Sequence, residues 1–218
     1  MTAPIPRPAD FRAGGPPPWA SLDDGERFVD LARARACLAG RAGKPAEVET
    51  PEDRASAVLV PLFEEEGELR VVLTLRNPNL RSHAGQVSFP GGRIDPGEDP
   101  VAAALREANE ETALEPAAVE VIGELDHLRT VVSNSFIVPV VGVLSGRQAL
   151  TPNPAEVDRI FDVSTADLLR DGVYREERWG IPEIDRAISF FEVEGETVWG
   201  ATGTMLKNFL MLALGLER

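Results

Sequence analysis

The chain has 218 residues, 43% of them hydrophobic, and a formal net charge of −14 at pH 7. This length supports one domain with a substantial core, and the acidic balance argues against non-specific nucleic-acid binding, which needs a basic surface. Cys37 is the only cysteine, which excludes an internal disulfide and a thiolate zinc cluster and fits a reducing, cytoplasmic setting. We expect no secretory signal, because residues 1–20 have no apolar core, and no membrane span, because every apolar run is too short.

The N-terminal region is rich in Pro, Gly and Ala. We predict a flexible arm over residues 1–26 and a single domain over residues 27–218. Apolar residues recur at helical spacing in residues 25–40, which predicts a helix that ends at Gly40. These apolar residues are Phe28, Leu31, Ala34 and Leu38. A polar linker over residues 41–53 follows.

A strand pattern begins at Ala57. Residues 57–63 and 69–75 are apolar and rich in β-branched side chains, and the acidic turn between them predicts a hairpin. Residues 87–92 form a short strand that breaks into a Pro–Gly turn. Asp99 is then a helix N-cap with Pro100 at the first helical position, and this helix is predicted to run to about Ala113.

The remaining elements alternate irregularly between strands and helices. A short helix is predicted after Ser164 or Thr165, and an apolar helix from Thr202 to about Leu214 closes the chain. Further strands are predicted over residues 118–125, 135–144, 157–163 and 173–180, and over residues 188–200 with a turn at 194–196. This order indicates an α/β sandwich around a mixed β-sheet.

The helix after Asp99 carries acidic side chains on one face. Glu107, Glu110 and Glu111 are spaced at i, i+3 and i+4, which brings their Cβ atoms to about 5–6 Å and makes the carboxylates repel. A hard divalent cation such as Mg²⁺ or Mn²⁺ would relieve that repulsion, because it prefers oxygen ligands. The alternative is a solvated acidic surface. Another face of the helix is apolar and consists of Val101, Ala104, Leu105, Ala108 and the methyl group of Thr112.

The spacing across residues 92–114 resembles the Nudix box, the loop–helix–loop signature of Nudix hydrolases. Five residues separate Gly92 from Glu98, and seven more precede Arg106. The box continues with Glu107, Ala108, Glu110, Glu111 and Leu114. Ala113 stands where the family usually has Gly, and we expect this to cost about 1 kcal/mol at a left-handed helix end without touching the metal ligands.

The resemblance implies a Nudix-type α/β/α sandwich and metal-dependent hydrolysis of a nucleoside diphosphate linked to another group. It implies that Glu107 and Glu111 are the principal ligands of Mg²⁺ or Mn²⁺. Glu110 is implied as a further ligand or as the holder of a metal-bound water, and a main-chain carbonyl near Gly92 completes the site. The metal then neutralises the diphosphate and activates a water.

Two other residues of the box are implied to act in catalysis with Glu107 and Glu110. Arg106 would orient the glutamates, and Glu98 would pair with Arg106 or lie outside the metal's direct ligands. The alternative for both is a purely structural role.

The segment before the box resembles the additional signature of the coenzyme A pyrophosphatase branch. Val72 replaces a usual Leu, and Asn77 stands where Ser or Ala is usual. The matching residues are Leu73, Thr74, Arg76, Arg81, Gly85, Phe89, Pro90, Gly91 and Gly92. Together with the box, the resemblance covers residues 72–114, about a fifth of the chain.

This second resemblance implies that the substrate is coenzyme A or a derivative, cleaved to 3′,5′-ADP and 4′-phosphopantetheine or its acyl form. Arg76 and Arg81 are hypothesised to contact its phosphates, because the guanidinium fork suits phosphate oxygens. His83, Gly85 and Phe89 belong to the same implied substrate-binding segment. The alternatives are that the arginines pair with acidic residues 64–66 and that His83 is a turn residue.

Several residues and two functional alternatives stay open. Three aromatic residues are candidates either for stacking on adenine or for packing in the core: Trp179, Trp199 and Phe190. Four acidic residues after the box are candidates for a distal base or an extra metal ligand: Glu156, Asp158, Glu176 and Glu177. Asp126 and His127 are candidates for the same roles. The alternative functions are an ADP-ribose or NADH pyrophosphatase and a non-catalytic Nudix-fold nucleotide sensor, and a homodimer through the arm is a further open question.

Overall fold

A mixed eight-stranded sheet organises the chain. The computed structural model describes residues 5–46, 54–130, 135–180 and 185–216. The strands of this main sheet are β2 (Arg54–Glu65), β3 (Glu68–Arg76), β4 (Val87–Ser88), β5 (Gly91–Arg93), β6 (Val119–Glu124), β7 (Leu128–Thr130), β8 (Ser135–Leu144) and β9 (Val157–Ser164). The order is β4-β3-β2-β8-β6, with β5 on β2, β7 on β8 and β9 on β3. Among the described strands, only β2 and β8 pair in parallel, so the sheet is mixed as predicted.

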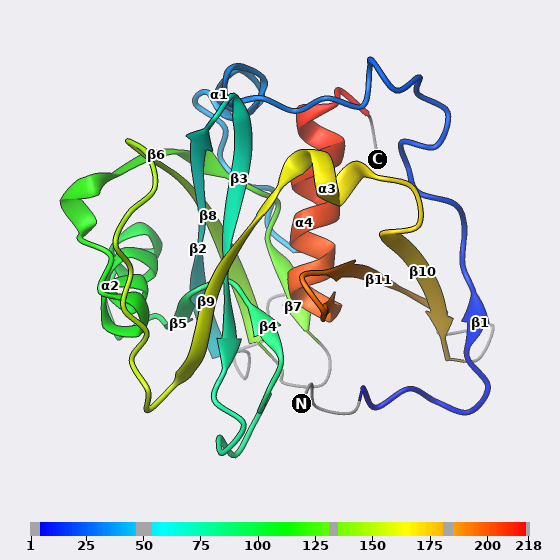
Figure 1. Cartoon of the computed structure of the whole chain (residues 1–218). Coiled ribbons are helices and arrows are strands. Elements are labelled where there is room, and N and C mark those ends of the chain that lie inside the picture. The colour runs from blue at the N-terminus through cyan, green and yellow to red at the C-terminus, as the bar shows by residue number, and fades with distance from the viewer. Residues whose placement is uncertain (1–4, 47–53, 131–134, 181–184, 217–218) are drawn as a thin grey trace.

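Helices cover both faces of the main sheet. Helix α2 (Pro100–Thr112) lies on one side, and α4 (Gly200–Ala213) lies on the other (Figure 1). Successive strand residues point to opposite faces, so β2 contributes to two cores. Leu59 packs in the core with α2, and Leu62 packs in the larger core with α4 and with α1 (Leu31–Leu38). The predicted α/β/α sandwich is confirmed.

A second, four-stranded antiparallel sheet lies beyond α4 (Figure 1). Its order is β1 (Arg12–Ala13), β10 (Tyr174–Trp179), β11 (Arg186–Val193) and β12 (Glu196–Trp199). The short helix α3 (Thr165–Leu169) precedes it, and the Ser164 hydroxyl accepts a hydrogen bond from the Asp167 amide as its N-cap. Within the described residues, no helix combines the length and apolar character needed to cross a bilayer.

The described part of residues 1–26, for which we predict a flexible arm, packs against the rest of the domain. Strand β1 pairs with β10, and the Gly14 amide donates to the Glu176 carbonyl at 2.7 Å. Trp19 is 1% exposed, and its ring centroid lies 5.2 Å from that of Tyr174. Composition pointed to an extended arm, but one buried tryptophan and a short strand pairing are enough to pack it onto the domain.

Most other element predictions are confirmed, but several elements differ: the predicted strand over residues 87–92 is divided into β4 and β5. The first helix begins at Leu31 because Asp30 caps it, which leaves Phe28 outside the helix and 46% exposed. Strand β7 and the 3₁₀ turn η1 (Pro116–Ala118) were not predicted. The closing helix starts at Gly200 rather than Thr202.

Candidate metal and diphosphate site

Helix α2 is fixed at both ends by its own sequence. The Asp99 carboxylate accepts from the amides of Val101 and Ala102 at 2.9 and 3.3 Å. At the other end Ala113 adopts the left-handed conformation, with φ 56° and ψ 24°, in agreement with the prediction for this position. Ala104 and Ala108 are buried against the sheet, so the rotation of the helix is set and its glutamate face turns toward β5.

Glu111 is the most buried carboxylate of this face. It is 2% exposed, and its Oε2 accepts from the Gly91 amide at 3.2 Å. Its Oε1 lies 3.5 Å from Nη1 of Arg76. Burial raises the pKa of Glu111 to about 7, against the opposing effects of Arg76 and the Gly91 amide. Near neutral pH, this carboxyl group therefore changes charge readily.

Glu107 lies against a glycine of β5. A Cβ atom added at Gly92 would come within 2.4 Å of the Glu107 Cδ atom, so only glycine allows this close approach. Burial is the largest influence and raises the pKa of Glu107, while Arg106 opposes it and the charges of Glu110 and Glu156 add to it. Together with the Glu111 contact to Gly91, this places two carboxylates at the same strand.

Arg106 connects the remaining glutamates of the site. Its Nε and Nη2 each donate to one oxygen of Glu98 at 2.9 Å. Its Nη1 donates to Glu107 at 3.0 Å and to the exposed Glu110 at 3.4 Å, and Nη2 also reaches the carbonyl of Arg93 at 3.0 Å. The hydrogen bonds from Arg106 lower the pKa of Glu98 to about 2. The expected pair of Arg106 and Glu98 is therefore present and braces Glu107.

Glu156 joins this group from outside the box. Its charge raises the pKa of both Glu107 and Glu111, so it lies near them. The loop before β9 is tied to α2, because the Asn153 amide donates to the Glu111 carbonyl at 2.9 Å. Glu176 and Glu177 belong to β10 in the other sheet, and Glu177 pairs with Arg7. No sequence signal distinguishes Glu156 from the other acidic candidates. Which of them lies near Glu107 and Glu111 depends on how the loop before β9 packs against α2.

The donor set fits a hard cation. Among the described residues, no three Asp, Glu, His or Cys side chains stand in a group that is already arranged to hold a metal ion. Arg106, Arg76 and the Gly91 amide contact the carboxylates instead. The donors are nevertheless all carboxylate oxygens. Burial raises the pKa values of Glu107 and Glu111, the charges of neighbouring glutamates add to it, and a divalent cation would favour the charged forms of both.

The basic segment before the box ends beside the same carboxylates. Arg76 closes β3, and its buried Nε has no hydrogen-bond partner within the described residues. Arg81 lies in the loop after β3, is exposed, and forms no ion pair with any described residue. The alternative that these arginines pair with residues 64–66 is wrong, because those residues lie at the far end of β3 and Glu65 pairs with Arg147 at 2.7 Å.

The loop between β3 and β4 contains His83 and Gly85, two residues of the implied substrate-binding segment. His83 is a turn residue with φ 54°, and its Nδ1 lies 3.0 Å from the Gln86 Oε1 atom. Gly85 is buried with φ 63°, and its amide donates to the Arg76 carbonyl at 3.2 Å. Phe89 is expected to belong to the substrate-binding segment, but its side chain is 2% exposed and lies in the larger core. It therefore supports the loop and offers no surface to a ligand.

The other open candidates lie away from α2. The side chains of Trp179, Trp199 and Phe190 form one ring cluster on the second sheet, and Phe190 is fully buried. Asp126 pairs with Arg41, and His127 Nε2 lies 3.1 Å from Glu124. The Arg41 ion pair, the hydrogen bond from the Gly43 amide to Glu124 and the hydrogen bond from the His127 amide to the Lys44 carbonyl anchor residues 41–44.

Comparison with known proteins identifies relatives over most of the chain. The NUDIX domain model matches residues 53–180. Nudix hydrolase 22, chloroplastic, of Arabidopsis thaliana is 37% identical over 166 residues, covering 70% of this chain and 53% of that protein. The uncharacterized Nudix hydrolase NudL of Photorhabdus laumondii is 36% identical over 156 residues, covering 71% and 82%. Nudix hydrolase 3 of Caenorhabditis elegans is 33% identical over 177 residues, covering 72% of each. The chain thus spans about half the length of the Arabidopsis relative.

Proposed function

We infer the function from one premise: the chain belongs to the Nudix hydrolase family. It is therefore a hydrolase of the pyrophosphatase type, and we propose that its substrate is coenzyme A or a derivative. The observation that carries the proposal is the approach of Glu107 and Glu111 to Gly91 and Gly92, directly beside the end of the arginine-bearing strand β3.

The proposed metal ligands are Glu107, Glu111 and Glu110, with a main-chain carbonyl near Gly92. When bound, Mg²⁺ or Mn²⁺ would neutralise diphosphate oxygens and lower the pKa of a bound water. Arg106 keeps Glu107 in place through its 3.0 Å hydrogen bond and is itself fixed by the bidentate pair with Glu98. The Gly91 amide holds Glu111 in the same way. These fixed carboxylates would keep a bound cation, and with it the diphosphate, in one position.

Glu156 is proposed as a further acidic member of the site, either a metal ligand or a base. We expect Glu156→Gln to lower kcat about 10- to 100-fold, the range typical for groups that support a metal site. The fold should be unaffected, since Glu156 contacts Asn77 and Asn153 only through main-chain atoms. The matched control is Glu194→Gln, which removes an exposed charge in the turn between β11 and β12 of the second sheet. Equal kcat values in the two variants would remove Glu156 from the site.

The coenzyme A assignment relies on the basic segment. Arg76 ends β3 with its Nη1 atom 3.5 Å from Glu111, beside the proposed metal ligands. Arg81 presents an unpaired guanidinium from the adjoining loop, in a chain whose net charge is −14. We propose that Arg76 faces the diphosphate and that Arg81 contacts a more distant phosphate, with the 3′-phosphate of coenzyme A as its partner.

Arg81→Ala tests this placement. We expect the variant to raise KM for coenzyme A about tenfold, the effect of losing one charge-assisted contact, and to leave KM for dephospho-coenzyme A within twofold. Arg170→Ala is the control, because Arg170 is an exposed arginine that pairs only with nearby Asp167. An equal rise in KM for both substrates would refute the 3′-phosphate assignment while leaving the hydrolase assignment intact.

Product analysis separates coenzyme A from the alternative substrates. The protein is incubated with coenzyme A, acetyl-coenzyme A, ADP-ribose and NADH in the presence of Mn²⁺ or Mg²⁺, and the products are identified by mass spectrometry. The proposal requires 3′,5′-ADP and 4′-phosphopantetheine as the dominant products. Faster release of AMP from ADP-ribose or NADH would instead assign the alternative pyrophosphatase, and binding without turnover of any substrate would assign a sensor.

A further inference from the structure

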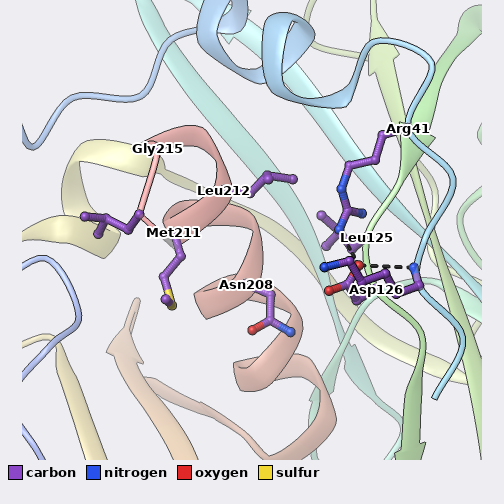
Figure 2. Close-up of a pocket in the computed structure, with 9 residues that line it drawn as sticks. Arg41, Leu125, Asp126, Asn208, Met211, Leu212 and Gly215 are labelled. Atoms are coloured by element: carbon purple, nitrogen blue, oxygen red, sulfur yellow. Dashed lines mark hydrogen bonds and ion pairs between the residues drawn. The ribbon is translucent and has the colours of Figure 1, made fainter. Parts of the chain in front are cut away.

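A cavity of about 470 Å³ lies on the α4 side of the main sheet (Figure 2). The C-terminal half of α4 forms one wall, and the segment from Arg41 to Lys44 together with Leu125 and Asp126 forms the other. Helix α2 and its glutamates pack on the opposite face of the sheet. The cavity is therefore separate from the candidate metal site, and its size lies within the range of small-molecule pockets.

Asn208 is the polar group that the fold leaves unused in this cavity. The residue is 8% exposed, and its side-chain amide has no hydrogen-bond partner among the described residues. The amide atoms of the Asn208 side chain are not completely shielded from solvent. Figure 2 shows Leu212 projecting from α4 toward the side where Arg41 lies, and Asn208 on the same helix with its amide turned downward in the view. A buried amide that opens onto a cavity offers one donor and one acceptor to a ligand.

Among the described residues that line the cavity, Lys44 is the cation that forms no ion pair. Arg41 forms an ion pair with Asp126 and also donates to the Glu124 carbonyl at 2.6 Å. The Lys44 amide donates to Asp126 at 3.1 Å, but the Lys44 ammonium forms no ion pair with a described residue. Asp126 cancels the charge of Arg41, so Lys44 gives the lining a single net positive charge. A monoanion matches this balance better than a dianion.

The remaining lining is apolar. Leu125 is 1% exposed, and Met211, Leu212 and Leu216 are half-buried around the same space. We propose that the cavity binds a small monocarboxylate with a medium-length aliphatic tail. Lys44 and the Asn208 amide donate to the carboxylate, and the tail packs against Met211, Leu212 and Leu216.

Octanoate is the probe that tests this site, and octanamide is its uncharged counterpart of equal length. Titration into ¹⁵N-labelled full-length protein is followed by NMR, with affinity measured by calorimetry. We expect saturable octanoate shifts at the Asn208 side-chain amide and in residues 41–44, and at least fivefold weaker binding of octanamide. The absence of saturable shifts, or equal affinity for the two probes, would overturn the proposal.

Two variants and one control assign the contacts. Lys44→Gln should weaken octanoate binding two- to fivefold, as expected for an exposed ion pair, and Asn208→Leu should weaken it about tenfold or more. Lys207→Gln removes the neighbouring charge on α4 outside the cavity lining and should leave the affinity unchanged. Pyrophosphatase activity should be retained in all three variants. Unchanged affinity in Lys44→Gln contradicts the proposal even where Asn208→Leu fails to fold, because Lys44 is exposed.

Discussion

Replacing Glu111 with glutamine is expected to lower kcat about a thousandfold, which corresponds to about 4 kcal/mol of lost transition-state stabilisation. The amide is nearly isosteric with the carboxyl group and can still accept the hydrogen bond from the Gly91 amide, so the packing around this 2%-exposed side chain is retained. What the variant lacks is the negative charge that would hold the cation. The measurement is steady-state turnover of coenzyme A with saturating Mn²⁺.

Glu115→Gln is the matched control, because Glu115 is an exposed glutamate just beyond the same helix and its side chain caps nothing. It should keep wild-type turnover. Loss of activity accompanied by loss of the cooperative thermal transition would indicate misfolding rather than missing chemistry. Turnover in Glu111→Gln within a few-fold of wild type would refute the assignment of Glu111 as a principal ligand.

In the absence of metal, the protein is expected to lose stability as pH rises from about 4.5 to 7, because Glu111 must then ionise in a buried position. Its pKa is raised from 4.5 to about 7 in the folded state, so the folded protein binds more protons than the unfolded chain across this interval. The contribution is fully present below pH 4.5 and is lost as pH passes 7. A shift of this size corresponds to about 3 kcal/mol in the free energy of unfolding.

Urea denaturation of the metal-free protein at several pH values between 4.5 and 8 measures this effect. Glu111→Gln removes the ionisation and should be more stable than wild type at pH 8, by up to about 3 kcal/mol, with a smaller difference at pH 4.5. Glu115→Gln should follow the wild-type curve. An identical pH dependence in wild type and Glu111→Gln would mean that Glu111 ionises without a folding cost.

The predicted loss of turnover and the predicted gain in stability of Glu111→Gln both depend on the burial of the Glu111 carboxylate. A carboxylate that is nearly sealed from water destabilises the metal-free fold, and the same arrangement favours a bound cation that removes the repulsion with Glu107. Glu111→Gln is therefore expected to separate stability from function, gaining the first while losing the second.

The sequence by itself determined the elements that depend on local interactions. Asp99, Pro100 and the residue at position 113 set the two ends of α2, and the helical spacing of Glu107 and Glu111 put both on one face. The pair of Arg106 and Glu98 was also predictable, because both belong to the same loop–helix–loop unit. These features follow from capping and periodicity, which act over a few residues.

Only the tertiary structure decided the features that join distant segments. In the fold, Glu156 rather than Glu176 lies near Glu107 and Glu111. Phe89 is buried in the core, and Trp19 of the N-terminal segment packs against Tyr174. Periodicity shows which face of a strand or helix is apolar, but it does not show which other segment covers that face. That choice depends on how the sheets and loops pack together, and it is made by long-range contacts that no local pattern encodes.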